Sequence, residues 1–212
     1  MTQSEVDLRA RIVEVGKSLF DRGYGVGSSG NISVRLGDGI LITPTNTSLG
    51  RLDPARIAKV ADDGTPVSGD LPSKEAFLHL AVYARRPEMR AVVHLHSTYA
   101  VALSTLSPGD PQNVLPPITA YFVMRVGNLP LVPYYPPGDR GLADAVGAAM
   151  EEAHAVLLAN HGSVVAGKTL DDALYGAEEL EETAKLYFIL KGEPTHFLDA
   201  AKVTELRARF RS

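Results

Sequence analysis

Apolar side chains recur with the spacing of an α-helix in five parts of the chain. The first predicted helix begins after Ser4, a residue type that caps helices, and ends at Gly23. Thr169 is placed to cap the last predicted helix, which runs to Leu190 and is stopped by Gly192. The other three helices are predicted over residues 72–86, 98–106 and 141–153.

Short apolar and β-branched runs between these helices predict strands. A glycine-rich turn at residues 37–39 indicates that two of the strands form a hairpin. The proline-rich region over residues 107–119 is predicted to be an ordered loop, because patterned apolar segments continue after it. The predicted strands cover residues 32–35, 40–43, 57–60, 91–96, 129–134, 155–160 and 163–166. The pattern therefore predicts an α/β domain whose polar clusters lie in loops.

Composition limits the number of domains and the kinds of partner. With 212 residues, 45% of them hydrophobic, the chain can fill one core, and we expect a single domain over residues 1–212. The formal net charge of −4 gives no indication of a basic surface for nucleic acid. The sequence contains no cysteine, which excludes disulfides and thiolate metal ligands and agrees with a reducing cytoplasm.

The sequence shows neither a targeting segment nor a membrane span. Residues 1–5 are polar and lead into the first amphipathic segment, unlike a signal peptide. Apolar runs are much shorter than the thickness of a bilayer requires. We therefore expect a cytoplasmic protein that does not associate with membranes.

Three histidines lie at the ends of two predicted apolar strands. His94 and His96 are separated by one residue, so both imidazoles can point to the same face of a strand. This pair alone is equally consistent with hydrogen-bonded core histidines. His161 follows a second apolar strand and makes a metal site the better interpretation. Three imidazoles without a thiolate favour zinc or a similar divalent ion.

A carboxylate could complete this site. Glu75 is predicted in the first turn of its helix, where a negative charge is favourable without any function. It is also a candidate fourth ligand or general acid and base beside a metal-bound substrate. His79 lies one turn further on, and we interpret it as a packing residue or one that supports the site. His154 and His196 are given no functional role.

Three short polar segments could bind an anion near the histidines. Glycine allows close approach of the backbone, hydroxyl and amide groups donate hydrogen bonds, and a lysine supplies a positive charge. Each segment alone is typical of an ordinary turn. The candidate residues are Gly30 and Asn31, Thr43 and Thr45, and Ser73 and Lys74.

Two further features have structural interpretations. Tyr121 is expected to be a buried aromatic residue with a hydrogen-bonded hydroxyl. Four glutamates on the last predicted helix are expected to form a solvated face or a helix contact. They are Glu178, Glu179, Glu181 and Glu182.

Taken together, these motifs resemble the class II aldolase/adducin family. The matching residues occur in the family's order and span almost the whole chain, which is more specific than any one motif. They are Gly30-Asn31, Thr43-Pro44-Thr45, Pro72-Ser73-Lys74-Glu75, His94-Leu95-His96, Tyr121 and Asn160-His161-Gly162. The resemblance implies a three-layer α/β/α sandwich with a central, mainly antiparallel sheet. It also implies a homotetramer with sites at subunit interfaces.

The resemblance also implies roles for individual residues. It implies one Zn²⁺ per subunit, replaceable by Mn²⁺ or Co²⁺, on His94, His96 and His161. Glu75 is implied as a further ligand in the resting state or as the acid and base. Tyr121 matches a catalytic tyrosine, acting in its own or a neighbouring subunit. The substrate phosphate is implied near Gly30, Asn31, Thr43, Thr45, Ser73 and Lys74.

One departure suggests a subgroup. The sugar-phosphate aldolases of the family commonly carry a second serine where this chain has Lys74. Together with residues 115–121 and 178–183, Lys74 makes the chain most similar to the 3-oxo-tetronate 4-phosphate decarboxylases. The implied reaction is loss of CO2 through a metal-stabilised enediolate, which gives dihydroxyacetone phosphate.

Three alternatives remain open from the sequence. An aldolase of the fuculose 1-phosphate type forms the same enediolate by releasing an aldehyde, so the metal site does not separate the two reactions. A methylthioribulose 1-phosphate dehydratase is another related enzyme. A non-catalytic, adducin-like assembly module belongs to a different class, and the presence of Glu75 with all three histidines counts against it.

Overall fold

A computed structural model describes residues 4–136 and 138–210. Residues 1–3, which contribute to the expectation that there is no signal peptide, lie outside this part. The helices are α1 Glu5–Asp21, η1 Leu49–Arg51, η2 Pro54–Arg56, α2 Ala76–Arg85, α3 Thr98–Ser104, α4 Ala120–Arg125, α5 Gly141–Ala149, α6 Leu170–Ile189 and α7 Ala200–Arg209. The strands are β1 Asn31–Arg35, β2 Ile40–Ile42, β3 Ala58–Val60, β4 Pro66–Ser68, β5 Ala91–Leu95, β6 Leu131–Val132, β7 Ala155–Leu158 and β8 Gly162–Gly167.

One eight-stranded sheet forms the centre of the molecule. Its strand order is β4-β3-β2-β1-β5-β8-β7-β6, and every neighbouring pair is antiparallel except the parallel pair β6 and β7. This order places β5 between β1 and β8.

 Although 66 residues (96–161) lie between the end of β5 and the start of β8, these two strands pair from Ala91 with Gly167 to Leu95 with Ser163. The sheet therefore brings distant segments together at its middle.

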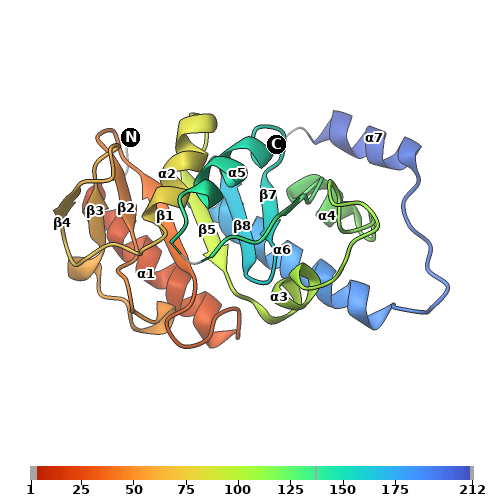
Figure 1. Ribbon diagram of the computed structural model, residues 1–212, viewed down its shortest axis with the longest axis horizontal. Coiled ribbons are helices and arrows are strands. Elements are labelled where there is room, and N and C mark those ends of the chain that lie inside the picture. Colours follow the sequence, from red (N-terminus) through yellow and green to blue (C-terminus); the bar gives the residue numbers. More distant parts are fainter. Residues whose placement is uncertain (1–3, 137, 211–212) are drawn as a thin grey trace.

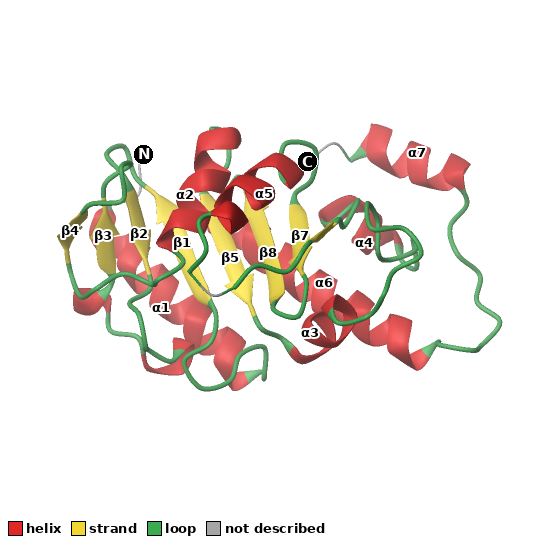
Figure 2. Cartoon of the chain, in the orientation of Figure 1, coloured by secondary structure: helices red, strands yellow, loops and turns green. Residues whose placement is uncertain are grey.

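The helices cover both faces of this sheet, as Figures 1 and 2 show. On one face, α1, α3, α4 and α6 pack on the sheet and form a core that includes Ile12, Val93, Phe122 and Leu180. On the other face, α2 and α5 lie side by side and form a second core around Leu78, Val92 and Val146. Because β5 contributes alternate side chains to both cores, it is buried along its whole length. The predicted α/β/α sandwich with a mainly antiparallel sheet is confirmed.

Capping and periodicity set the boundaries of the long helices as expected. The Ser4 hydroxyl accepts a hydrogen bond from the Asp7 N–H at the start of α1, and the Thr169 hydroxyl accepts one from the Asp172 N–H at the start of α6. Beyond these helices, Gly23 and Gly192 adopt φ values of +81° and +90°, which favour glycine. The hairpin of β1 and β2 is also present, with Ser33 opposite Ile42.

Several elements differ from the sequence prediction. Strand β4 is exposed and helix α7 has no buried residue, so neither carries the apolar pattern that would reveal it. Helix α4 follows the proline-rich loop and was not predicted. Strand β6 is limited to two residues and α5 ends at Ala149, both shorter than expected. Among the described residues, no helix combines the length and apolar character needed to cross a membrane.

Candidate metal and substrate site

The three histidines meet where β5 ends beside the β7–β8 hairpin. His94 lies in β5, and His96 follows the last residue of that strand. His161 lies in the turn between β7 and β8, in which Asn160 has a φ of +57°. The next residue must be small, because a Cβ on Gly162 would lie 2.3 Å from the Leu95 carbonyl oxygen. This close approach places His161 beside His96.

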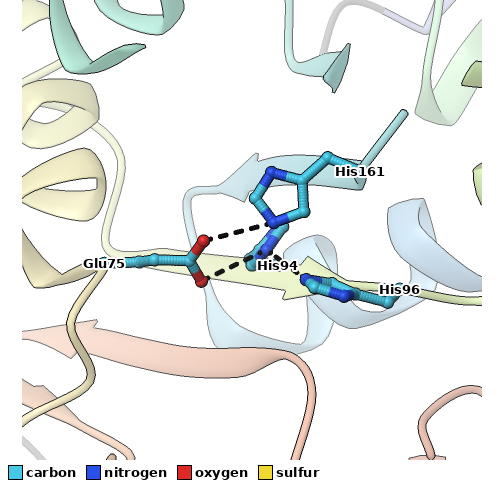
Figure 3. Close-up of side chains that lie close together, drawn as sticks. All are labelled: Glu75, His94, His96 and His161. Carbon is cyan, nitrogen blue, oxygen red and sulfur yellow. Dashed lines mark hydrogen bonds and ion pairs between the residues drawn. The ribbon is translucent and has the colours of Figure 1, made fainter. Parts of the chain in front are cut away.

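The imidazole rings surround one point together with a carboxylate (Figure 3). The Nε2 atoms of His94 and His96 lie 2.9 Å apart, and the Glu75 oxygens lie 3.3 Å from Nε2 of His94 and Nε2 of His161. One ligand atom from each of the four residues falls within 4.8 Å of the others. Ligands of a tetrahedral zinc ion lie about 3.3 Å from one another, so this donor set fits a divalent metal ion.

The orientation of His94 also fits a metal ligand. Its side chain is fully buried, and its Nδ1 lies 2.8 Å from the Ser163 carbonyl oxygen. A carbonyl only accepts, so Nδ1 carries the proton and Nε2 presents its lone pair to the centre of the cluster. Metal-binding histidines commonly have such a partner for the second nitrogen.

Glu75 stands at the start of α2 and not in its first turn. It is the N-cap residue, and its side chain makes no capping hydrogen bond. One carboxylate oxygen accepts a hydrogen bond of 2.7 Å from the Asn31 side-chain amide. The interpretation of Glu75 as a helix-stabilising carboxylate is therefore replaced by one in which it faces the histidines.

The ionisable side chains of the cluster shift one another's pKa values. Burial by itself would raise the pKa of Glu75, but His94, His161 and Asn31 together hold it well below its usual range. Burial lowers the pKa of His96 to about 3, with help from the neighbouring imidazoles. His94 has a raised pKa, because Glu75 outweighs the effect of burial. The carboxylate and the lone pairs thus form an arrangement that attracts a cation.

A cavity of about 420 Å³ opens beside this cluster. Five of the six residues predicted to bind phosphate line it, and they come from three separate segments of the chain. They are Gly30, Asn31, Thr45, Ser73 and Lys74. Glu75, His96 and His161 line the same cavity, so a molecule inside it can touch both the anion-binding loops and the metal ligands.

Thr43 and Tyr121 lie outside this group. Thr43 is buried, and its hydroxyl accepts a hydrogen bond from the Ile32 N–H, while its carbonyl oxygen accepts one from the Ser73 N–H. It therefore joins two loops of the cavity, and its contact with phosphate remains a prediction. Tyr121 was expected to be buried, but 61% of it is exposed on α4, where it contacts Arg125 rather than the histidines.

The structure adds residues that the sequence did not single out. Tyr134, Tyr135 and Leu142 also line the cavity. The signal in the sequence was a pair of aromatic residues between Pro133 and Pro136. Such a segment resembles an ordinary turn unless its position over a cavity is known.

The glutamate run on α6 contains one buried carboxylate. Glu181 accepts hydrogen bonds from the Ser97 hydroxyl at 2.7 Å and from the N–H groups of Tyr99 and Ala100 at 2.8 Å. It thereby caps α3, which begins two residues after His96. The predicted helix contact is confirmed for Glu181, whereas Glu182 is exposed.

Replacing Glu181 by glutamine is expected to destabilise the fold by about 2 kcal/mol, since one of three donors then faces an amide NH2 group. This corresponds to a fall in Tm of about 4–8 °C, measured by thermal unfolding. Glu182→Gln on the same helix is the control and should leave Tm nearly unchanged. Equal effects of the two substitutions would contradict the capping role.

Comparison with known proteins agrees with this arrangement. The family described as "Class II Aldolase and Adducin N-terminal domain" matches residues 10–188. The 3-oxo-tetronate 4-phosphate decarboxylase of Escherichia coli (strain K12) is 52% identical over 205 residues, which are 96% of this chain and 97% of that protein. The L-fuculose phosphate aldolase of Methanocaldococcus jannaschii is 38% identical over 178 residues, covering 84% of this chain and 94% of the aldolase.

A solved structure also matches. The crystal structure of YgbL from Escherichia coli has a TM-score of 0.94 and 50% sequence identity, with 97% of this chain and 100% of that chain covered. The predicted similarity to the decarboxylase subgroup is confirmed, because five decarboxylases of this name are 49–52% identical to the chain. The chain belongs to the class II aldolase and adducin family.

Proposed function

We propose that this protein is a zinc-dependent decarboxylase that converts a 3-oxo-tetronate 4-phosphate into dihydroxyacetone phosphate and CO2. The observation that carries the proposal is the identity of about half of all residues, over nearly the whole chain, with enzymes of that name. Fuculose phosphate aldolases are more distant, at 37–38% identity.

The residues that would hold the zinc ion are His94, His96 and His161, with Glu75 as a further ligand before substrate enters. Their donor set of three imidazoles and one carboxylate supports zinc, while the cluster itself is compatible with other divalent ions. A bound divalent ion supplies Lewis acidity, which stabilises negative charge on the substrate oxygens.

The other residues position the substrate and move a proton. Gly30, Asn31, Thr45, Ser73 and Lys74 would hold the phosphate, because they offer backbone and side-chain donors and one positive charge at the cavity wall. The bond between C1 and C2 of the substrate then breaks, and CO2 leaves. The electron pair of that bond remains on the C2–C3 unit as an enediolate.

Glu75 would deliver the proton that completes the reaction at C2. Its oxygens lie 3.3 Å from Nε2 of His94 and Nε2 of His161, and a substrate that replaces Glu75 at the metal would separate it from these groups, so that it can take up a proton from solvent. A protonated Glu75 can then act as the general acid, and the product is dihydroxyacetone phosphate.

Tyr121 is proposed to act in a neighbouring subunit of a homotetramer. This proposal rests on its exposed position on α4, away from the cavity of its own chain. The molecular mass in solution tests it. A fully active monomer would contradict an essential role for Tyr121 across an interface.

An aldolase remains the second candidate, because the metal ligands and phosphate loops serve either reaction. A substrate comparison separates them. The purified, zinc-loaded protein is incubated with 3-oxo-tetronate 4-phosphates and with fuculose 1-phosphate, and CO2, dihydroxyacetone phosphate and aldehyde are measured. We expect CO2 and dihydroxyacetone phosphate from the first compounds; release of aldehyde without CO2 would overturn the proposal. An adducin-like module would give no product from either.

Replacing Lys74 by serine is expected to raise KM about tenfold and to change kcat less than about threefold. The reason is that a phosphate contact made equally in the ground state and the transition state contributes to binding alone. Lys191→Ser, at another exposed lysine, is the control for loss of one positive charge. A fall in kcat at unchanged KM would show that Lys74 does not act through phosphate binding.

A further inference from the structure

A chain of buried polar groups leads from the Glu75 carboxylate into the space between β1 and α2. Asn31 donates to Glu75, and its side-chain oxygen lies 2.5 Å from Nε2 of His79. Nδ1 of His79 lies 2.7 Å from the Ser33 hydroxyl, which lies 2.7 Å from the Tyr83 hydroxyl. His79 and Ser33 are completely buried, and Asn31 and Tyr83 are nearly so.

The chemistry of the end groups gives this chain one direction. An ionised carboxylate only accepts hydrogen bonds, so Asn31 turns its NH2 group toward Glu75 and its carbonyl oxygen toward His79. That oxygen requires the proton of His79 on Nε2. Nδ1 is then a lone pair that accepts from the Ser33 hydroxyl, and Ser33 accepts in turn from Tyr83. Burial lowers the pKa of His79 to about 3, in agreement with a neutral ring.

We propose that His79 is a positioning residue that fixes the side-chain amide of Asn31 and, through it, the catalytic orientation of the Glu75 carboxylate. The opposite tautomer would hold the proton on Nδ1 and accept from the Asn31 NH2 group. The amide would then present its oxygen to Glu75, where two acceptors repel. The tautomer of a residue that does not line the cavity thus determines how the carboxylate is held.

A purely structural role explains these observations less well. His79 lies on the face of α2 that also carries Leu78 and Val82, where an apolar side chain would pack without the cost of burying an imidazole. Both ring nitrogens have partners, and one of these partners, Asn31, reaches the cavity. Residues that orient an active group in this manner are commonly worth a factor of about 10–100 in activity.

Steady-state kinetics of three variants test the inference. This test measures decarboxylation and therefore rests on the proposed function. His79→Leu should lower kcat about 10–100-fold while KM and the zinc content stay within about twofold to threefold. His79→Gln keeps a donor near Asn31 and should recover most of the lost activity. Tyr83→Phe removes only the far end of the chain and should change kcat less than about threefold. Unchanged kcat in correctly folded His79→Leu would overturn the proposal, as would equal losses in the leucine and glutamine variants.

The His79 tautomer provides a readout that is independent of turnover. In protein labelled with ¹⁵N-histidine, the His79 resonances are assigned by their loss in His79→Gln, and long-range ¹H–¹⁵N spectra locate the ring proton. We expect it on Nε2 in the wild type, and a larger share on Nδ1 in Ser33→Ala. A proton on Nδ1 in the wild type would overturn the inference. Absence of decarboxylation with the expected tautomer would contradict the proposed function but not the hydrogen-bond chain.

Discussion

Replacing Glu75 by glutamine is expected to lower kcat by a factor of about 10²–10⁴ and to leave KM for the phosphorylated substrate within a few fold. Glutamine has nearly the same shape and can still accept the hydrogen bond from Asn31, but it cannot deliver a proton to C2. The phosphate loops are untouched, so binding of the ground state should persist. Steady-state kinetics with the zinc-loaded variant measure both constants.

The control for this experiment is Glu151→Gln, a carboxylate on the surface that pairs with Arg85. It should match the wild type in kcat and KM. Metal content must be measured for both variants, because Glu75 is also a proposed ligand. Normal turnover of Glu75→Gln would remove Glu75 from catalysis, whereas a loss of turnover that parallels a loss of zinc would restrict it to metal binding.

Replacing His96 by alanine is expected to remove the metal ion and the activity together. The substitution leaves two imidazoles and Glu75 around the site. Loss of a hydrogen-bond partner of a metal ligand weakens metal binding by a factor of up to about 100, and loss of a ligand itself should weaken it more. Lewis-acid stabilisation is worth several kcal/mol, so kcat should fall about 10³-fold. Metal analysis after dialysis and a titration with added Zn²⁺ test both effects.

His196→Ala is the matched control, because His196 is exposed and far from the cluster in the sequence. It should retain one zinc ion per subunit and full activity. Removal of the ion from the wild type with a chelator should reproduce the loss seen in His96→Ala, and added Zn²⁺ should reverse it. An active, metal-free His96→Ala protein would contradict the assignment of the three histidines.

Local patterns in the sequence were sufficient to predict the long helices and the central strands. Their apolar faces repeat with the period of the element, and Ser4 and Thr169 cap the helices as their residue type indicates. Strand β4 and helix α7 lack buried apolar faces, so the same reasoning could not detect them. The tertiary environment, which is absent from a local pattern, determines these elements.

Part of the candidate site could likewise be predicted from the sequence, and part only from the structure. His94, His96 and His161 were selected from chemistry and strand position, and the pairing of β5 with β8 is what brings them together. The burial of Glu181 and the exposure of Tyr121 were not predictable, because each depends on which helix packs against it. The hydrogen-bond chain through His79 joins β1 to α2 and could be found only from the structure.

The most direct test of the proposed reaction follows the atoms of a 3-oxo-tetronate 4-phosphate labelled with ¹³C at C1. The zinc-loaded enzyme is incubated with this substrate in D2O, and the products are followed by NMR and mass spectrometry. We expect equal amounts of ¹³CO2 and dihydroxyacetone phosphate, with one solvent deuteron on the carbon that was C2, and a rate that falls sharply in Glu75→Gln. Retention of the ¹³C label in a phosphorylated product would contradict the proposed decarboxylation. So would formation of dihydroxyacetone phosphate from fuculose 1-phosphate but not from the 3-oxo-tetronate 4-phosphate.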